Sequence, residues 1–157
     1  TANVLTQFDA DMQAMTEKRV PSTGRILYVT PAVRTLIKNA QQIQRTFDVQ
    51  NTNAANVNRI VSSLDQVQIE EVPPELMRTA YNFTTGWAAG ASAKQIYMML
   101  IHPTAIITPV SYEFAQLDPP SAVTEGKYYY FEESFEDVFI LNKKKDAIRF
   151  TIEPDSD

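Results

Sequence analysis

Residues 95–153 limit the possible folds of this chain most strongly, because they form successive runs rich in aromatic and β-branched side chains. Such side chains favour strands over helices. The clearest runs are 95–101 and the aromatic segment 128–141. No residues in this half stand in an arrangement that performs a reaction. We therefore expect it to form sheet and to hold a shape rather than to turn over a substrate.

Prolines and polar residues divide this half into segments. His102 and Pro103 end the first run, and Pro109 lies inside the extended segment 105–114. Because proline cannot donate a hydrogen bond to a strand ladder, that segment is predicted to be an edge strand or to contain a bulge. The remaining predictions are a loop at 117–126, a polar turn at 142–146 and a strand at 147–153 that closes a hairpin.

The first half of the chain predicts helices around short strands. An amphipathic helix is predicted at 2–18, because Val4, Phe8, Met12 and Met15 recur at helical spacing. The remaining predictions are a buried strand at 25–29, a helix at 31–40 that starts at a Thr30 hydroxyl cap, a polar stretch at 41–58, strands at 59–61 and 67–72, a helical turn at 76–80 and a loop at 82–94.

This order of elements predicts an α+β fold. We expect a mixed central sheet flanked by helices, joined to an N-terminal helix and to C-terminal extended strands and a hairpin. A doubly wound sheet would require regular alternation of strands and helices, which the second half does not supply. A length of 157 residues fits one ordinary domain, or one domain with a small extension.

The composition of the chain excludes several classes of function. It has no cysteine, which removes disulfide frameworks, thiolate metal sites and thiol nucleophiles. A formal net charge of −5 gives no basic footprint for sequence-independent binding of nucleic acid. No uninterrupted apolar run is long enough to span a membrane, and the N-terminus lacks the basic and apolar regions of a signal peptide. No membrane partner is therefore expected.

Candidate catalytic and metal-binding residues are few. His102 is the only histidine, and no spacing selects a serine and an aspartate to act with it. We expect His102 to be a structural side chain, hydrogen-bonded to backbone at the end of a strand. The carboxylates of Glu132, Glu133, Glu136 and Asp137 could hold calcium or magnesium, but an extended strand divides them between two faces. No catalytic residue, metal site or cofactor is predicted.

Two charged segments are candidates for contacts between copies of the chain. Lys143, Lys144 and Lys145 form either a solvated hairpin tip or a contact with an acidic patch on a neighbouring copy. The run from Glu132 to Asp137, in which Glu132 and Glu136 share one face of the predicted strand, is one such patch. The sequence leaves both interpretations open.

Aromatic and glycine residues supply further candidate contacts. Gly86 and Gly90 flank Trp87 in the predicted loop, without the spacing of a phosphate-binding motif. Trp87 either packs on the core or is offered to a partner, since tryptophan is enriched at interface hot spots. Tyr128 and Tyr130 open the aromatic segment and are candidate contacts as well.

Four hydrophobic segments carry a resemblance to a known family. They read GRILYVTPAV at 24–33, VQIEEVP at 67–73, YMMLIHPTAI at 97–106 and EDVFIL at 136–141. Their order resembles that in the C-terminal portion of tailed-bacteriophage and prophage major capsid proteins of the HK-ninety-seven type. The similarity covers nearly all of the chain.

The resemblance implies a domain layout and a function. Residues 20–110 would form an axial-domain-like core, and residues 1–19 and 111–157 a peripheral-domain-like helix and strands, with one compact unit as the alternative. The protein would be a non-enzymatic coat subunit, made in the cytoplasm of the bacterial host. It would assemble with copies of itself into hexamers and pentamers of an icosahedral shell, which encloses the genome without sequence-specific binding.

The resemblance also implies segments that precede this one. Full-length members carry an N-terminal arm, an extended loop and a long helix first, so we expect this chain to be a truncated core. The lysine of the crosslinks that some members form lies in that loop, and the crosslink is not carried over to this chain. The alternative function is another phage structural component, such as a tail protein or a surface-binding module.

Overall fold

The protein is described by a computed structural model that covers residues 4–40, 43, 60–84 and 88–154. Its body is a five-stranded mixed sheet with the strand order β11-β6-β1-β3-β2. These strands are β1 (Ile26–Val29), β2 (Ser63–Leu64), β3 (Val67–Glu71), β6 (Ile96–Ile101) and β11 (Ile148–Ile152). β1 runs parallel to β3 and antiparallel to β6, so the predicted mixed sheet is confirmed.

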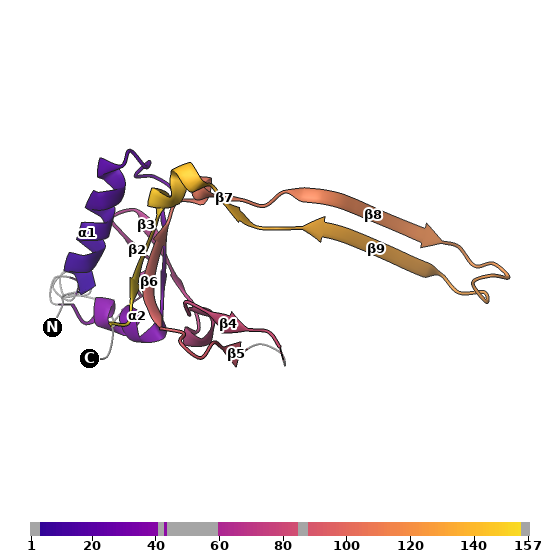
Figure 1. Cartoon of the computed structure of the whole chain (residues 1–157), viewed down its shortest axis with the longest axis horizontal. Coiled ribbons are helices and arrows are strands. Elements are labelled where there is room, and N and C mark those ends of the chain that lie inside the picture. The colour runs from indigo at the N-terminus through magenta and orange to yellow at the C-terminus, as the bar shows by residue number, and fades with distance from the viewer. Residues whose placement is uncertain (1–3, 41–42, 44–59, 85–87, 155–157) are drawn as a thin grey trace, which may run out of the picture.

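Two helices, α1 (Val4–Glu17) and α2 (Pro31–Lys38), cover one face of this sheet (Figure 1). Alternate residues of each strand point toward them, as the two-residue period of a strand requires. Leu27 and Val29 of β1 are fully buried, whereas Ile26 and Tyr28 point to the other face and are half-buried. The helices contribute Phe8, Met15, Val33 and Ile37 to the same core. Both predicted helices are thereby confirmed.

Arg25 is buried at the start of β1, with 1% of its surface exposed. Its guanidinium donates to the carbonyls of Val20 and Pro21 at 2.8 Å each, to that of Met12 at 3.1 Å and to the hydroxyl of Thr16 at 3.1 Å. These acceptors surround the C-terminal end of α1, where the helix dipole is negative. Burial lowers the pKa of Arg25 from its ordinary value. Arg25 thus fixes the end of α1 against the sheet without an ion pair to any carboxylate among the described residues.

His102 joins β6 to the loop before β1. Its Nδ1 accepts from the backbone N–H of Thr104 at 3.3 Å and lies 2.8 Å from the Thr104 hydroxyl. Its Nε2 lies 3.2 Å from the carbonyl oxygen of Thr23. With both ring nitrogens bonded and 8% of its surface exposed, His102 is the structural strand-end residue that the sequence indicates.

A long hairpin projects from this body (Figure 1). It consists of β8 (Val110–Asp118) and β9 (Tyr129–Glu136), which are antiparallel. At its base, β7 (Ile106–Ile107) pairs with β10 (Phe139–Ile140). Pro109 lies between β7 and β8, and the register of the hairpin shifts between Val110 and Tyr112, so the predicted bulge is present.

The prediction that 147–153 forms a hairpin with the aromatic segment is wrong. The 3-10 helix η3 (Asn142–Ala147) turns the chain back to the body, and β11 then pairs with β6. This pairing places Ile148 opposite Ile101, and both side chains are partly buried in the sheet. The partner of the aromatic strand is instead β8, from the preceding segment.

Other predictions needed smaller corrections. Residues 60 and 61 lie outside any strand, and β2 forms a hairpin with β3 through Asp65 and Gln66, whose φ angles are both positive, as in a type I′ turn. The turn expected at 76–80 is a 3-10 helix, η1 (Pro74–Leu76), which begins at its proline. The predicted loop at 82–94 contains β5 (Ala88–Ala89) and the end of β4 (Tyr81–Asn82), which pair with each other.

Two further predictions concern caps and unassigned segments. Thr30 is the N-cap of α2, but its hydroxyl makes no capping bond and has no hydrogen-bond partner among the described residues. The aromatic segment 128–141 is divided into β9 and β10 rather than being one strand. The polar stretch 41–58 lies outside the described residues, apart from position 43, which is helical.

Candidate subunit-contact surface

The β8–β9 hairpin carries many of the exposed large apolar side chains of the described chain. Every residue of both strands is exposed. An isolated two-stranded hairpin is at best marginally stable in water. Contiguous exposed apolar surface on a soluble protein marks a site of interaction. The hairpin is therefore the strongest candidate surface for contact with another molecule.

One face of the hairpin is aromatic. In the observed register, Tyr112 lies opposite Phe135 and Phe114 opposite Glu133, so their side chains point to the same side. The ring centroids of Tyr112 and Phe135 are 5.6 Å apart, and those of Phe114 and Phe131 are 6.0 Å apart. We call this side the aromatic face; its members are Tyr112, Phe114, Gln116, Asp118, Tyr129, Phe131, Glu133 and Phe135.

The opposite side of the hairpin is acidic. Glu132 and Glu136 alternate with Ser134 along β9, and Glu113 of β8 lies opposite Ser134. The hydroxyl of Tyr130 donates to a carboxylate oxygen of Glu132 at 3.0 Å. This bond, together with the negative charge of Glu132 and Glu113, raises the pKa of the Tyr130 hydroxyl. We call this side the acidic face; its members are Val110, Glu113, Ala115, Leu117, Tyr130, Glu132, Ser134 and Glu136.

The structure therefore brings three of the predicted contact residues, Tyr130, Glu132 and Glu136, onto one face. Tyr128 lies just before β9 and is 70% exposed. Gly90 follows β5 and donates its N–H to the carbonyl of Ala80 at 3.1 Å. A Cβ added at Gly90 would lie 3.3 Å from the Ala80 side chain, so this glycine serves a close approach of two chain segments. Gly86 and Trp87 lie outside the described residues.

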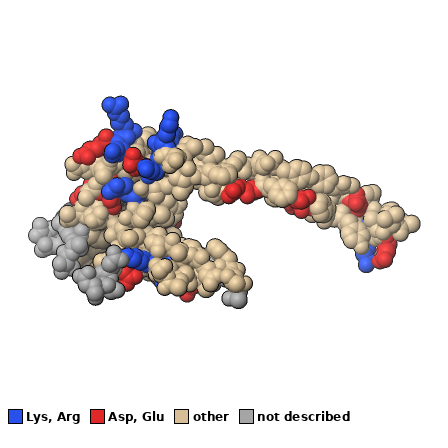
Figure 2. All heavy atoms as spheres, in the orientation of Figure 1, with Lys and Arg blue, Asp and Glu red and all other residues tan. Residues whose placement is uncertain are grey.

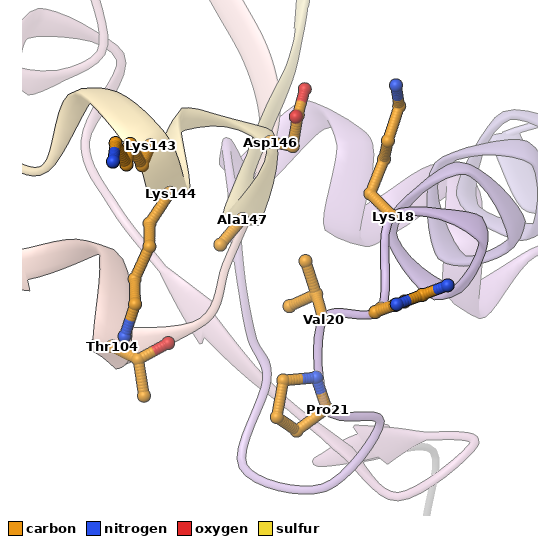
Figure 3. Close-up of a pocket in the computed structure, with 9 residues that line it drawn as sticks. Lys18, Val20, Pro21, Thr104, Lys143, Lys144, Asp146 and Ala147 are labelled. Carbon is orange, nitrogen blue, oxygen red and sulfur yellow. The ribbon is translucent and has the colours of Figure 1, made fainter.

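Lys143, Lys144 and Lys145 do not form the tip of a hairpin. They lie in η3, on the body, and all three are exposed. Lys143 and Lys144 line a cleft of about 250 Å³ together with Lys18 and Arg19, which follow α1. In Figure 3, Lys18 and Lys144 stand on opposite sides of this cleft, and its floor contains Val20, Pro21 and Ala147.

We call Lys18, Arg19, Lys143 and Lys144 the basic cleft. All four side chains are exposed. Asp146 lies on the rim, but no carboxylate in the described part of the chain comes within ion-pair distance of any of the four. Figure 2 shows the basic side chains gathered on the body, whereas the charged side chains along the hairpin are mainly acidic.

The sequence did not reveal the basic cleft. Lys18 and Lys144 are far apart along the chain, and only the return of the chain through η3 brings them to one cleft. The sequence indicates the two faces of the hairpin more clearly. The alternation in YYFEESFE, read with the two-residue period of a strand, separates Phe131 and Phe135 from Glu132 and Glu136.

Two features are absent from the described residues. Within them, no group of three or more His, Asp or Glu side chains could hold a metal ion. A search of the same residues found no helix long and apolar enough to cross a membrane. The imidazole of His102 bonds only to Thr104 and to the carbonyl of Thr23, so no nucleophile–base–carboxylate arrangement forms around it in the described chain.

Comparison with known proteins gives a likeness in fold. No family model matches this sequence, and no curated protein matches it. A chain in the asymmetric unit of the bacteriophage PhiM1 mature capsid superposes with a TM-score of 0.60 and 16% identity, over 95% of this chain and 46% of that one. A chain of Mycobacterium phage Che8 gives a TM-score of 0.49 and 10% identity, over 96% of this chain and 49% of that one. This chain spans about half the length of either.

The PhiM1 capsid chain and this chain therefore share a fold. The shared region includes almost all of the α+β arrangement described above, since it covers 95% of this chain. Their low sequence identity limits the likeness to the fold itself.

Proposed function

We propose that this chain is part of a structural subunit of a phage capsid, with a fold of the HK-ninety-seven type, and that it corresponds to the C-terminal portion of that subunit. The subunit assembles with copies of itself into hexamers and pentamers of an icosahedral shell around the viral genome. The observation that carries this proposal is the likeness in fold to the PhiM1 mature capsid chain, which extends over 95% of this chain.

The surface of the described chain supports the same role. A shell subunit buries large parts of its surface against neighbouring copies. The β8–β9 hairpin offers such a surface, because its apolar side chains are exposed although they favour burial. The Gly86–Trp87 segment, Gly90 and Tyr128 remain proposed contacts of the same subunit.

The proposal includes a domain layout. Residues 20–110 form an axial-domain-like core, and residues 1–19 and 111–157 contribute to a peripheral-domain-like region. Strand β11 belongs to the central sheet together with β1 and β6, so the last part of the chain returns to that core. The proposed subunit acts by assembly and not by catalysis, and its place is the virion.

Electron microscopy of the natural full-length protein tests the proposal. The protein is expressed in bacteria, purified by size and imaged by negative stain and cryo-EM. Closed shells, or hexamers and pentamers that convert into shells, are the expected result. Tubes or tail-like particles would indicate the alternative of another phage structural component. A monomer at every protein and salt concentration would contradict both.

A further inference from the structure

We infer that the acidic face of the β8–β9 hairpin of one copy binds the basic cleft of a second copy, in a head-to-tail contact. This inference rests on the proposed function and names the surfaces that join two subunits. The acidic face is the side of the hairpin that carries Glu113, Glu132 and Glu136. The basic cleft is formed by Lys18, Arg19, Lys143 and Lys144.

The two surfaces have opposite charge, and neither forms an ion pair within the described part of its own chain. Residues 110–137 carry seven carboxylates and one lysine, while the whole chain has a net charge of −5. The single lysine, Lys127, already faces Glu125 at 3.8 Å. Within the described residues, neither the three carboxylates of the acidic face nor the four cations of the cleft form an ion pair. Charge complementarity therefore selects another copy of this chain as the occupant.

The shapes of the two surfaces suit this contact. Glu132 and Glu136 are four residues apart on one strand, which corresponds to about 13 Å. Glu113 lies between them, because it stands opposite Ser134. A cleft of about 250 Å³ admits individual side chains rather than a whole strand. The hairpin would thus lie across the cleft, insert carboxylates from its acidic face and leave its aromatic face for a further neighbour.

The position of the two surfaces predicts the symmetry. The hairpin projects away from the body, whereas the cleft lies on the body between α1 and η3 (Figures 1 and 3). A contact between two different surfaces is heterologous, so each bound copy still offers a free hairpin or a free cleft to the next. Repetition of such a contact closes a ring when the rotation between copies divides a full turn, as in a hexamer or pentamer.

Adjacent residues provide matched control variants. Glu132 belongs to the acidic face and Glu133 to the aromatic face, although both are exposed glutamates of β9. Lys144 lines the cleft, whereas its neighbour Lys145 does not, although both are exposed lysines of η3. Glu132→Lys and Glu133→Lys make the same change in charge one residue apart, and so do Lys144→Glu and Lys145→Glu.

The experiment measures assembly of the natural full-length protein by sedimentation and electron microscopy. Glu132→Lys and Lys144→Glu should each reduce the assembled fraction at least about tenfold, while the two control variants should change it less than about twofold. The double variant Glu132→Lys/Lys144→Glu should recover assembly, because it restores the opposite charges. Equal effects of the test and control variants, or no recovery in the double variant, would overturn the contact.

Chemical cross-linking separates this inference from the proposed function. A zero-length carbodiimide reagent joins carboxylates to amines that are in contact, and mass spectrometry of mixed isotope-labelled particles identifies links between copies. Links from Glu132 or Glu136 to Lys143 or Lys144 are expected. Shells without these links would overturn the contact and keep the proposed function. If the same links are found in oligomers that never form shells, the contact is supported and the proposed function as a shell subunit is overturned.

Nucleic acid is the other possible occupant of a basic cleft. If nucleic acid occupies the cleft, Lys144→Glu would leave the assembly of shells unchanged and reduce the amount of nucleic acid retained in them. This result would overturn the contact between copies and assign the cleft to phosphate groups.

Discussion

Replacement of Arg25 by methionine should destabilise the chain strongly, although Arg25 has no carboxylate partner among the described residues. Methionine matches the length of the aliphatic part of arginine and removes its charge and donors. The carbonyls of Val20 and Pro21 each lose a charged donor at 2.8 Å. The carbonyl of Met12 still accepts from the Thr16 hydroxyl at 2.8 Å, so its loss is smaller.

The expected loss in the free energy of unfolding comes mainly from the carbonyls of Val20 and Pro21. A buried acceptor that loses its partner costs about 1–3 kcal/mol. The release of the guanidinium from an apolar site offsets part of that cost, since burial of a charge is itself unfavourable. We expect a net loss of about 2–4 kcal/mol in the free energy of unfolding. For a chain of this length, that loss lowers Tm by about 4–16 °C.

The assay is thermal and urea unfolding followed by circular dichroism. Arg34→Met is the matched control, because Arg34 forms one ion pair with Glu71 at 3.1 Å and the side chains are 27% and 42% exposed. Exposed pairs of this kind contribute at most about 1 kcal/mol. Equal losses in the free energy of unfolding for Arg25→Met and Arg34→Met would refute the argument that the hydrogen bonds of buried Arg25 at the end of α1 stabilise the fold.

Three further predictions concern other parts of the described chain. Leu27→Ala should lower the free energy of unfolding by about 2–5 kcal/mol in urea titrations, because Leu27 is fully buried between the sheet and the helices; a loss below 1 kcal/mol, on the order of a surface change, would contradict this packing. Glu132→Gln should lower the raised pKa of Tyr130 toward its ordinary value, since the phenolate then forms beside a neutral group; NMR titration of the Tyr130 ring checks this, and an unchanged pKa would argue against the bond. Gln66→Gly should raise the stability by about 0.5–1 kcal/mol in the same urea assay, because Gln66 has a φ of 67°. A decrease in stability would show that the glutamine side chain contributes more than the relief of backbone strain.

Local patterns in the sequence predicted the elements that depend on local chemistry. The spacing of Phe8 and Met15 was enough to find α1 and its buried side, since a helix of this amphipathic kind must place that side on the core. The apolar run of β6 was found for a similar reason, and its central residues Met98 and Leu100 are buried. His102 was interpreted correctly because a lone histidine between a strand and a proline has few chemical roles.

Pairings between distant segments could not be read in the same way. β11 pairs with β6 across about fifty residues, and nothing in its own sequence distinguishes that partner from the nearer β9. The turn between β2 and β3 was missed because Asp65 and Gln66 adopt positive φ angles without the glycine that signals such a turn. The basic cleft depends on the return of the chain to the body through η3. The sequence shows its basic residues but does not show that they lie close together.

The exposed apolar side chains of the hairpin favour contact with another molecule over a fold with weak packing. The body already buries its core residues between the sheet and two helices, so the aromatic side chains of β8 and β9 are not needed to complete it. Phe131 and Phe135 are more than half exposed, and burial of such a side chain is favourable by about 1.5–3 kcal/mol. That free energy is not gained within one described chain. It becomes available only when a second surface covers the aromatic face, which lies opposite the acidic face and stays open to a further neighbour in the contact inferred above.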